Sequence, residues 1–195
     1  MDHEFEAKCV VTSIEDARQR LVRIGAQCVR PERLLRRSVF DFPDGALDRR
    51  GAWARVRDEG NCITMSYKQA PERSTIADCF ETELVIDSYE HGVAFCEDLG
   101  MIRKSYQETK RESWETGDAK FDIDTWPGIP PFIEVEAVDE AIVRRYVEAL
   151  GFAWADALFG GVAAIYQHVL GLPEREVNRI PEITFAKPPQ SITPR

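Results

Sequence analysis

Charged and apolar side chains alternate along several short segments of this sequence, and this alternation restricts the fold more than any other feature. Residues with a period of two point to opposite faces of a β-strand. The pattern predicts eight strands, near residues 3–11, 35–42, 52–58, 61–69, 78–87, 102–114, 118–126 and 131–138. Gly60 and Gly117 each lie between two neighbouring runs, where a glycine with positive φ makes a tight hairpin. The strands are therefore expected to be antiparallel.

Four other segments have the 3.6-residue periodicity of helices that cover a sheet. They run over residues 13–25, 87–100, 139–151 and 162–171, and each ends at a glycine that can stop a helix. After Pro173 the chain is rich in proline. We therefore expect one domain over residues 1–172, and a tail over 173–195 that is part of that domain or a strap on its surface.

The polar face of the predicted strands carries both signs of charge. Its charged members are Glu4, Glu6, Lys8, Arg55, Arg57, Lys68, Glu81, Glu83, Arg111, Asp122, Asp124, Glu134 and Glu136. One interpretation is an open sheet whose charged face meets water. The other is an α+β fold, with an eight-stranded antiparallel barrel that has a charged interior and helices packed outside. Buried charges are costly unless they are paired or bind ligands, so the barrel implies a multiply anionic ligand with a divalent metal.

The residue types on this face suit that chemistry. Carboxylates at i and i+2 on neighbouring strands, Glu4 with Glu6 and Glu134 with Glu136, can converge on a hard cation such as Mg²⁺ or Mn²⁺. Lysine and arginine on the facing strands would bind phosphate oxygens, arginine through two donors and lysine as a point charge. A single Glu-x-Glu is common in strands, so the joint pattern carries the prediction.

In order and spacing, these motifs resemble the CYTH domain, a member of the triphosphate tunnel metalloenzyme superfamily that includes class IV adenylate cyclases and thiamine triphosphatases. The resemblance covers about residues 3–170. It depends on Glu4-x-Glu6-x-Lys8, Phe40-Asp41 with Pro43-Asp44-Gly45, Arg55-x-Arg57, Lys68, Glu81-x-Glu83, Arg111, Asp124 and Glu134-x-Glu136.

The resemblance implies an eight-stranded tunnel that binds a triphosphate through basic side chains and a metal through glutamates. The implied metal ligands are Glu4, Glu6, Glu134 and Glu136, with Asp122 and Asp124 as further ligands or as partners of the cations. The implied phosphate-binding residues are Lys8, Arg55, Arg57, Lys68 and Arg111, with Lys187 closing one mouth of the tunnel. Lys8 is also the candidate catalytic base, because a lysine in a tunnel can lose its proton and an arginine does not.

Two positions depart from the family pattern. Val39 stands where relatives often have tyrosine, which argues against a tyrosine-assisted mechanism. Thr109 stands where a second basic residue is usual, so one phosphate contact is either lost or supplied by Lys104 or Lys110.

The function expected from these features is metal-dependent hydrolysis of a small molecule that contains a triphosphate: inorganic triphosphate, thiamine triphosphate or a nucleoside triphosphate. One alternative is a class IV adenylate cyclase that converts ATP to cyclic AMP and pyrophosphate. A second alternative is a polyphosphate-binding module without catalysis. Dimers are common among relatives, so a homodimer is compatible with all three.

Composition excludes several other classes. The chain has no run of 18 apolar residues and begins with the polar Asp2, His3 and Glu4, so neither membrane spanning nor secretion is expected. Its five cysteines are odd in number and have no close pair, which favours the cytoplasm. A net charge of -9 argues against nucleic acid as a partner, although it does not exclude a local cationic pocket.

Overall fold

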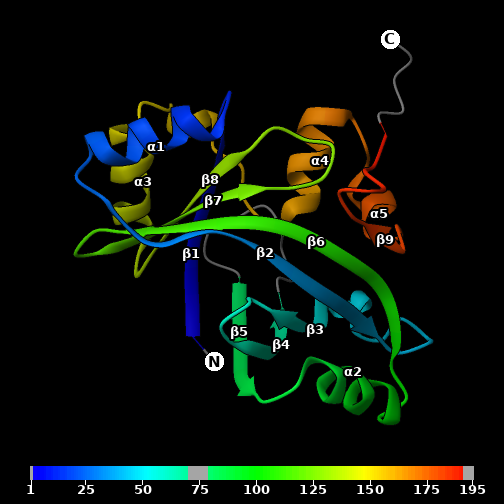
Figure 1. The fold of residues 1–195 in the computed structure, drawn as a ribbon. Helices are drawn as coiled ribbons and strands as arrows, with labels where there is room; N and C mark the ends of the chain where they lie inside the picture. Colours follow the sequence, from blue (N-terminus) through cyan, green and yellow to red (C-terminus); the bar gives the residue numbers. More distant parts are fainter. Residues whose placement is uncertain (1, 70–78, 191–195) are drawn as a thin grey trace.

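The computed structural model describes the backbone of residues 2–69 and 79–190, and the side chains of residues 5–69 and 80–190 (Figure 1). Its strands are β1 (Asp2–Val10), β2 (Gln27–Asp41), β3 (Ala52–Asp58), β4 (Ile63–Gln69), β5 (Cys79–Ile86), β6 (Ile102–Glu115), β7 (Ala119–Thr125), β8 (Phe132–Ala137) and the short β9 (Glu182–Ile183). Its helices are α1 (Ile14–Arg23), α2 (Tyr89–Asp98), α3 (Glu140–Ala149), α4 (Val162–Leu170) and α5 (Glu174–Val177), with 3₁₀ turns at Asp48–Arg50 and Trp154–Asp156.

The strands pair in the order β2-β3-β4-β5-β1-β8-β7-β6, and a further pairing of β2 with β6 joins the two ends of this series. All of these pairings are antiparallel. Within the described residues, the seam between β1 and β5 consists of Asp2, His3 and Glu4 of β1, paired with Glu81, Phe80 and Cys79. Further along β1, Lys8 and Leu158 exchange backbone hydrogen bonds of 2.8 and 2.9 Å. The predicted α+β fold with an eight-stranded antiparallel tunnel is confirmed.

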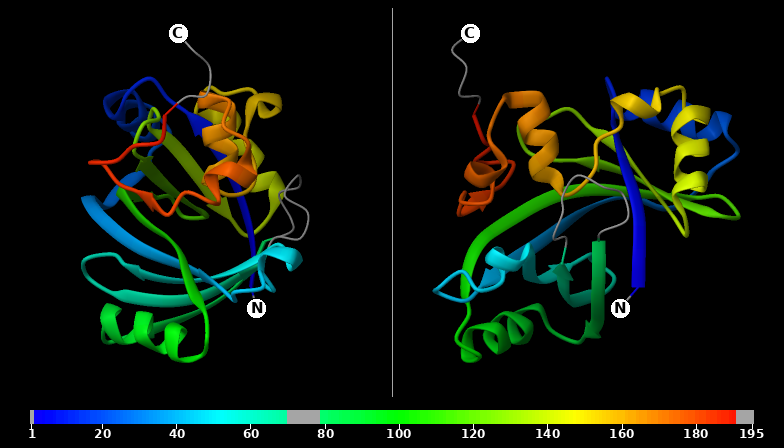
Figure 2. Two further views of the ribbon diagram at one scale, coloured as in Figure 1. Left: turned by 90° about the vertical axis from the view of Figure 1, so that its right-hand side faces the viewer. Right: turned by 180° about the vertical axis from the view of Figure 1, so that it is seen from behind.

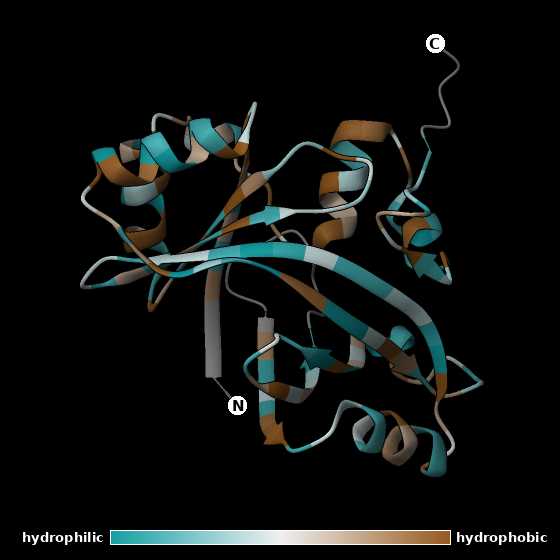
Figure 3. Cartoon of the chain, viewed as in Figure 1, coloured by the Kyte–Doolittle hydropathy of each residue, from teal (hydrophilic) through white to brown (hydrophobic). Residues whose placement is uncertain are grey.

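Strand β2 is longer than its sequence pattern predicted. The predicted strand over 35–42 begins at Gln27 in the structure, and its pairing with β6 shifts register at two points between Cys28 and Arg33. Pro31 lies within the second of these shifts, between Arg30 and Arg33; a proline cannot donate to a ladder and is tolerated at such bulges. The bulges interrupt the period of two, which hid the first half of the strand. Figure 3 shows hydrophilic and hydrophobic bands succeeding one another along β2.

The helices cover the outside of the strands in three groups. Helices α1 and α3 bury Leu21 and Val147 in one apolar cluster with residues of β1, β7 and β8. Helix α2 buries Cys96 against Val56 of β3, and α4 buries Tyr166 in a third cluster. Figures 1 and 2 show α1 with α3, α2, and α4 with α5 on separate sides of the molecule. The apolar strand faces therefore point outward to helices, and the charged faces point inward.

Side chains cap the N-termini of the first three helices. The side chains of Ser13, Ser88 and Asp139 accept hydrogen bonds from backbone N–H groups in the first turns of α1, α2 and α3. Such caps satisfy donors that a helix cannot pair internally.

The segment after α4 lies along β6. The backbone N–H of Tyr106 donates to the Pro181 carbonyl at 2.9 Å, and β9 then pairs with β6 in parallel. Val177 and Ile183 are buried in the same apolar cluster as α4. Within the described residues, no helix has the length and apolar character needed to cross a membrane.

Candidate functional site

The ring of strands encloses a cavity of about 590 Å³. Each of the strands β1 to β8 contributes side chains to its lining, and acidic and basic residues line it in nearly equal numbers. The predicted site residues that line it are Glu6, Lys8, Arg55, Arg57, Lys68, Arg111, Asp122, Asp124, Glu134 and Glu136. The backbone of Glu4 lies on β1, but its side chain is outside the described residues.

Five carboxylates on β1, β7 and β8 form what we call the acidic wall: Glu6, Asp122, Asp124, Glu134 and Glu136. Strand pairing places them in rows. Glu6 lies opposite Glu136, and Lys8 and Asp122 both lie opposite Glu134. Like charges directly opposite each other destabilise a sheet, and here each glutamate of the Glu6–Glu136 pair has a lysine beside it, Lys8 at 2.7 Å from Glu6 and Lys120 at 3.3 Å from Glu136.

Lys8 is embedded in this wall. Its Nζ lies 2.7 Å from Glu6 Oε1 and 3.3 Å from Glu134 Oε2, and the residue is almost fully buried. Burial opposes the charged form, but the charges of Glu134 and Glu6 outweigh it and raise the pKa of Lys8 above its ordinary value. Lys8 therefore carries its proton at neutral pH, as a phosphate ligand requires; the structure gives no support to its predicted role as a base.

Arg111 on β6 is the second cation held by the acidic wall. Its guanidinium contacts Asp122 at 2.7 Å, Asp124 at 2.6 and 2.7 Å, and Glu134 at 3.5 Å. Burial lowers the pKa of Arg111, but the three carboxylates overcome it and raise that pKa well above its ordinary value. Burial also raises the pKa of Asp122 to about 6 despite the opposing charge of Arg111, since Asp124 and Glu134 lie close by. One guanidinium thus does not fully compensate three carboxylates.

The opposite side of the cavity is basic. Four residues of β2 and β3 form what we call the arginine wall: Arg33, Arg37, Arg55 and Arg57. Arg55 contacts Glu81 of β5 at 2.9 Å, and Lys68 of β4 contacts the same carboxylate at 2.8 Å. Burial, followed by the charge of Arg57, lowers the pKa of Arg55 to about 10. Glu81 has the complementary shift, because Lys68 and Arg55 overcome burial and lower its pKa to about 2.

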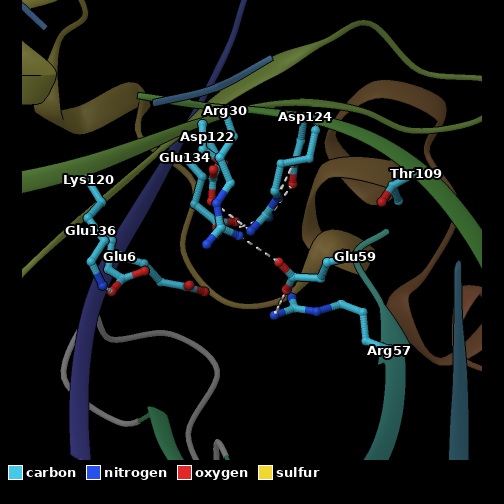
Figure 4. Close-up of polar contacts among 12 residues, drawn as sticks. Glu6, Arg30, Arg57, Glu59, Thr109, Lys120, Asp122, Asp124, Glu134 and Glu136 are labelled. Carbon is cyan, nitrogen blue, oxygen red and sulfur yellow. Dashed lines mark hydrogen bonds and ion pairs between the residues drawn. The ribbon is translucent and has the colours of Figure 1, made fainter. Parts of the chain in front are cut away.

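Glu59 is the carboxylate that the arginine wall holds. It follows β3, and its backbone N–H donates to the Cys62 carbonyl in the hairpin turn before β4. Its carboxylate pairs with Arg57, and lies 3.6 Å from Arg30 and 3.7 Å from Arg33. Figure 4 shows Glu59 between Arg57 and the group formed by Arg30, Asp122 and Glu134. Burial raises the pKa of Glu59, but the charges of Arg57 and Arg111 lead the opposing effects that hold it below its ordinary value.

The model of the CYTH domain matches residues 2–150 of the chain. The chain belongs to the CYTH family. No curated protein matches its sequence.

Solved structures share the fold at low sequence identity. The PH1012 protein of Pyrococcus horikoshii has a TM-score of 0.67 at 17% identity, over 79% of this chain and 93% of that one. A Vibrio parahaemolyticus protein provisionally named an adenylate cyclase has a TM-score of 0.63 at 18% identity, over 90% and 92% of the two chains. HpAC1 from Hippeastrum, provisionally named an adenylyl cyclase and described with a dominant triphosphatase activity, has a TM-score of 0.62 at 15% identity, over 90% and 100%. At these identities the likeness shows the fold alone.

Several cavity residues of this CYTH domain were not predicted from its sequence. Arg30, Arg33 and Arg37 lie on the part of β2 that follows or adjoins the bulges, and Glu59 was seen only as a turn residue. The period of two does include Arg37: it lies two residues before Val39, so both side chains are on the strand face that lines the cavity. The signal for Arg30 and Arg33 was interrupted by the bulges.

The two lysines considered as substitutes at the Thr109 position lie in different places. Lys104 lines the cavity, 3.8 Å from Asp41 and 3.7 Å from Asp48. Lys110 is outside the cavity lining, 3.8 Å from Glu32. Of the two, only Lys104 is therefore placed to meet a ligand.

Lys187 is set apart from the predicted phosphate-binding residues. Its Nζ lies 2.5 Å from Glu182, its side chain is 69% exposed, and it is not among the residues that line the cavity. The loop after β9 keeps it on the outer surface beside β6. Lys187 therefore lies outside the described lining of the cavity, and its place at a mouth of the tunnel stays a prediction.

The donors of the acidic wall fit a hard divalent cation by their chemistry, since all are carboxylate oxygens. Within the described part of the chain, no three Asp, Glu, His or Cys side chains are grouped closely enough to hold a metal ion. Lys8 and Arg111 occupy several of the carboxylates as ion-pair partners. Glu6 pairs with Lys8 at 2.7 Å, and Glu136 pairs with Lys120, which lies beside it in Figure 4, at 3.3 Å, so a metal ion at this pair would share the two carboxylates with both lysines.

Proposed function

We propose that this CYTH domain is a metal-dependent triphosphatase, which hydrolyses inorganic triphosphate, thiamine triphosphate or a nucleoside triphosphate. One observation carries the proposal: among the described residues, basic side chains from six strands meet carboxylate pairs inside a single cavity of about 590 Å³. The basic residues shared by this proposal and the sequence pattern are Lys8, Arg55, Arg57, Lys68 and Arg111. Triphosphate is a compact, multiply charged anion that such a cavity suits.

The proposed mechanism is positional and electrostatic. Arg55 and Arg57 would bind phosphate oxygens through paired N–H groups, while Lys8 and Lys68 act as point charges. Asp122 and Asp124 orient the guanidinium of Arg111 toward the phosphates. Because ion pairs fix these donors before substrate arrives, little reorganisation is needed as charge develops on the leaving phosphate.

The residues proposed to hold Mg²⁺ or Mn²⁺ are Glu4, Glu6, Glu134 and Glu136. A divalent cation bound there supplies neutralisation of phosphate charge and activation of water. Lys8 contacts both Glu6 and Glu134, and Arg111 also contacts Glu134, so these ion pairs keep the carboxylate oxygens on the cavity side of β1 and β8.

Product analysis tests the proposal. The purified protein is incubated with Mg²⁺ or Mn²⁺ and with tripolyphosphate, thiamine triphosphate or ATP in turn, and orthophosphate and cyclic AMP are both measured. Orthophosphate release that EDTA abolishes supports the triphosphatase. Cyclic AMP with pyrophosphate from ATP would instead establish the cyclase, and tight binding without turnover would establish a binding module.

A paired variant locates the chemistry. The double substitution Glu6→Gln with Glu136→Gln keeps the shape of the acidic wall and removes two charges, and we expect it to lower turnover by about 100-fold or more. Glu148→Gln is the control, because that residue lies on the exposed face of α3 and pairs only with Arg144 at 3.0 Å in the described structure. Full activity in the double variant contradicts the assignment.

The cytoplasmic location and the homodimer remain predictions from the sequence.

A further inference from the structure

Arg37 differs from the other cations of the cavity in having no acidic partner. Among the described residues, every other basic side chain that lines the cavity forms an ion pair: Lys8, Arg30, Arg33, Arg55, Arg57, Lys68, Lys104, Arg111 and Lys120. Arg37 is 7% exposed, and no described carboxylate lies within ion-pair distance of it. Among the residues that the structure describes, it is a buried charge without a counterion.

Neutral groups hold this guanidinium in place. Nη2 donates a 2.7 Å hydrogen bond to Thr109 Oγ1, and the guanidinium carbon lies 4.7 Å from the centre of the Trp126 ring. A guanidinium has five N–H donors, and here Nε is buried without a hydrogen-bond partner. The indole N–H of Trp126, which also lines the cavity, is a second buried donor without a partner. The position is fixed, and donors remain for a ligand.

The surroundings of Arg37 repel its charge. Arg57 lies directly opposite it in the pairing of β2 with β3, which is an unfavourable arrangement for like charges. Burial first, and then the charges of Arg57, Arg55 and Arg111, hold the pKa of Arg37 well below its ordinary value, and the weaker attraction of Asp124 does not overcome them. A residue kept only for packing would be apolar here, since a buried unpaired charge is strongly destabilising. A bound anion removes that cost.

The location of Arg37 relative to the acidic wall suggests which part of a ligand it meets. In Figure 4, Thr109, the residue that Arg37 contacts, lies on the opposite side of the view from Glu6 and Glu136. A phosphate chain that begins near those glutamates must cross the cavity to reach Arg37.

We propose that Arg37 and Arg57 form a phosphate subsite for the phosphoryl group farthest from Glu6 and Glu136, and that this subsite makes the cavity selective for triphosphate over diphosphate chains. The inference rests on the proposed function, because it takes the same cavity as the substrate site. Arg37 is a binding and specificity residue in this scheme: Thr109 and Trp126 orient it without neutralising it.

The test replaces Arg37 by methionine and measures binding without metal. Tripolyphosphate and pyrophosphate are titrated by calorimetry into wild-type protein and Arg37→Met, both in EDTA. Loss of a charged hydrogen-bonding group predicts about 10- to 100-fold weaker tripolyphosphate binding and less than about threefold change for pyrophosphate. Because an unpaired buried charge is removed, the melting temperature of the ligand-free variant is expected to stay equal or rise.

Arg36→Met is the matched control. Arg36 is the neighbouring residue on β2 but faces outward, 3.0 Å from Asp58 and 3.5 Å from Glu90. Its replacement is expected to leave both affinities unchanged. A second variant, Arg37→Lys, keeps the charge but loses the planar donor pair, and we expect an intermediate loss of tripolyphosphate affinity.

Three results overturn the inference: equal tripolyphosphate affinity in wild type and Arg37→Met, parallel losses for both ligands with a lower melting temperature, or no metal-free binding by the wild type. Orthophosphate release with Mg²⁺ is measured separately on the wild type. Release with any of those three results leaves the triphosphatase standing and removes the subsite. If the wild type binds tripolyphosphate and Arg37→Met weakens that binding, but no orthophosphate is released with Mg²⁺, the subsite stands and the triphosphatase is contradicted.

Discussion

The acidic wall and the arginine wall both bury several like charges, negative in one and positive in the other, and both share a few counterions among them. In the acidic wall, two cations, Lys8 and Arg111, are shared among several carboxylates. In the arginine wall, Arg33 and Arg57 share Glu59 with the neighbouring Arg30, and Arg37 has no described acidic partner. Each wall therefore retains an excess of its own charge. The difference teaches that a cavity with almost balanced total charge can still present a cation site and an anion site to one ligand.

The largest expected effect comes from removing the shared cation of the acidic wall. Arg111→Met leaves Asp122, Asp124 and Glu134 buried without their principal partner. Breaking a buried pair in this way lowers the free energy of unfolding by about 3 to 5 kcal/mol. Denaturant unfolding measures it, with the surface variant Arg144→Met as a control expected to cost about 0.5 kcal/mol or less. A loss below about 1 kcal/mol for Arg111→Met would show that the carboxylates do not depend on it.

A smaller effect is expected when the charge of Glu59, the anion shared in the arginine wall, is removed. Stability should fall, while affinity for tripolyphosphate should rise. Glu59→Gln leaves Arg30, Arg33 and Arg57 with less compensation, so the free energy of unfolding should fall by about 1 to 3 kcal/mol. Tripolyphosphate no longer competes with a resident carboxylate, so its affinity should rise by about three- to tenfold. Thermal unfolding and calorimetry on the same samples give both values. Weaker binding would mean that Glu59 itself helps to hold the ligand.

The smallest effect is expected from a substitution on the outer surface, away from the acidic wall and the arginine wall. Lys187→Met removes an exposed ion pair with Glu182 that lies outside the cavity. Neither the melting temperature nor the Kd for tripolyphosphate should change beyond experimental error, because exposed pairs add little. A clear loss of affinity would restore Lys187 to the mouth of the tunnel.

Much of the architecture could be predicted because it depends on local alternation. A period of two was enough to place Lys8 and Glu134 on one face, and the sheet pairing then brought them to 3.3 Å. Alternation fails where strands bulge, so the part of β2 that carries Arg30 and Arg33 was missed. Alternation also carries no information on the side chains of turns, so it does not predict that Glu59, next to Gly60 in the hairpin turn, lines the cavity.

Which acidic residue pairs with which basic residue could not be predicted from the sequence, for a different reason. Asp122 was assigned alternatively to metal or to cations, and its contact with Arg111 at 2.7 Å depends on the register of β6 against β7. Register is set by the whole sheet rather than by neighbours in the chain. The same holds for Arg37, whose position opposite Arg57 follows from the pairing of β2 with β3.

A crystal structure with tripolyphosphate and Mn²⁺, with anomalous diffraction to locate the metal, tests the central claim most directly. The account predicts one phosphate chain inside the cavity, in contact with Arg55 and Arg57 on one side, and Mn²⁺ bound by carboxylates of the acidic wall on the other. Tripolyphosphate on the outer surface, or Mn²⁺ away from Glu6 and Glu136, would contradict it.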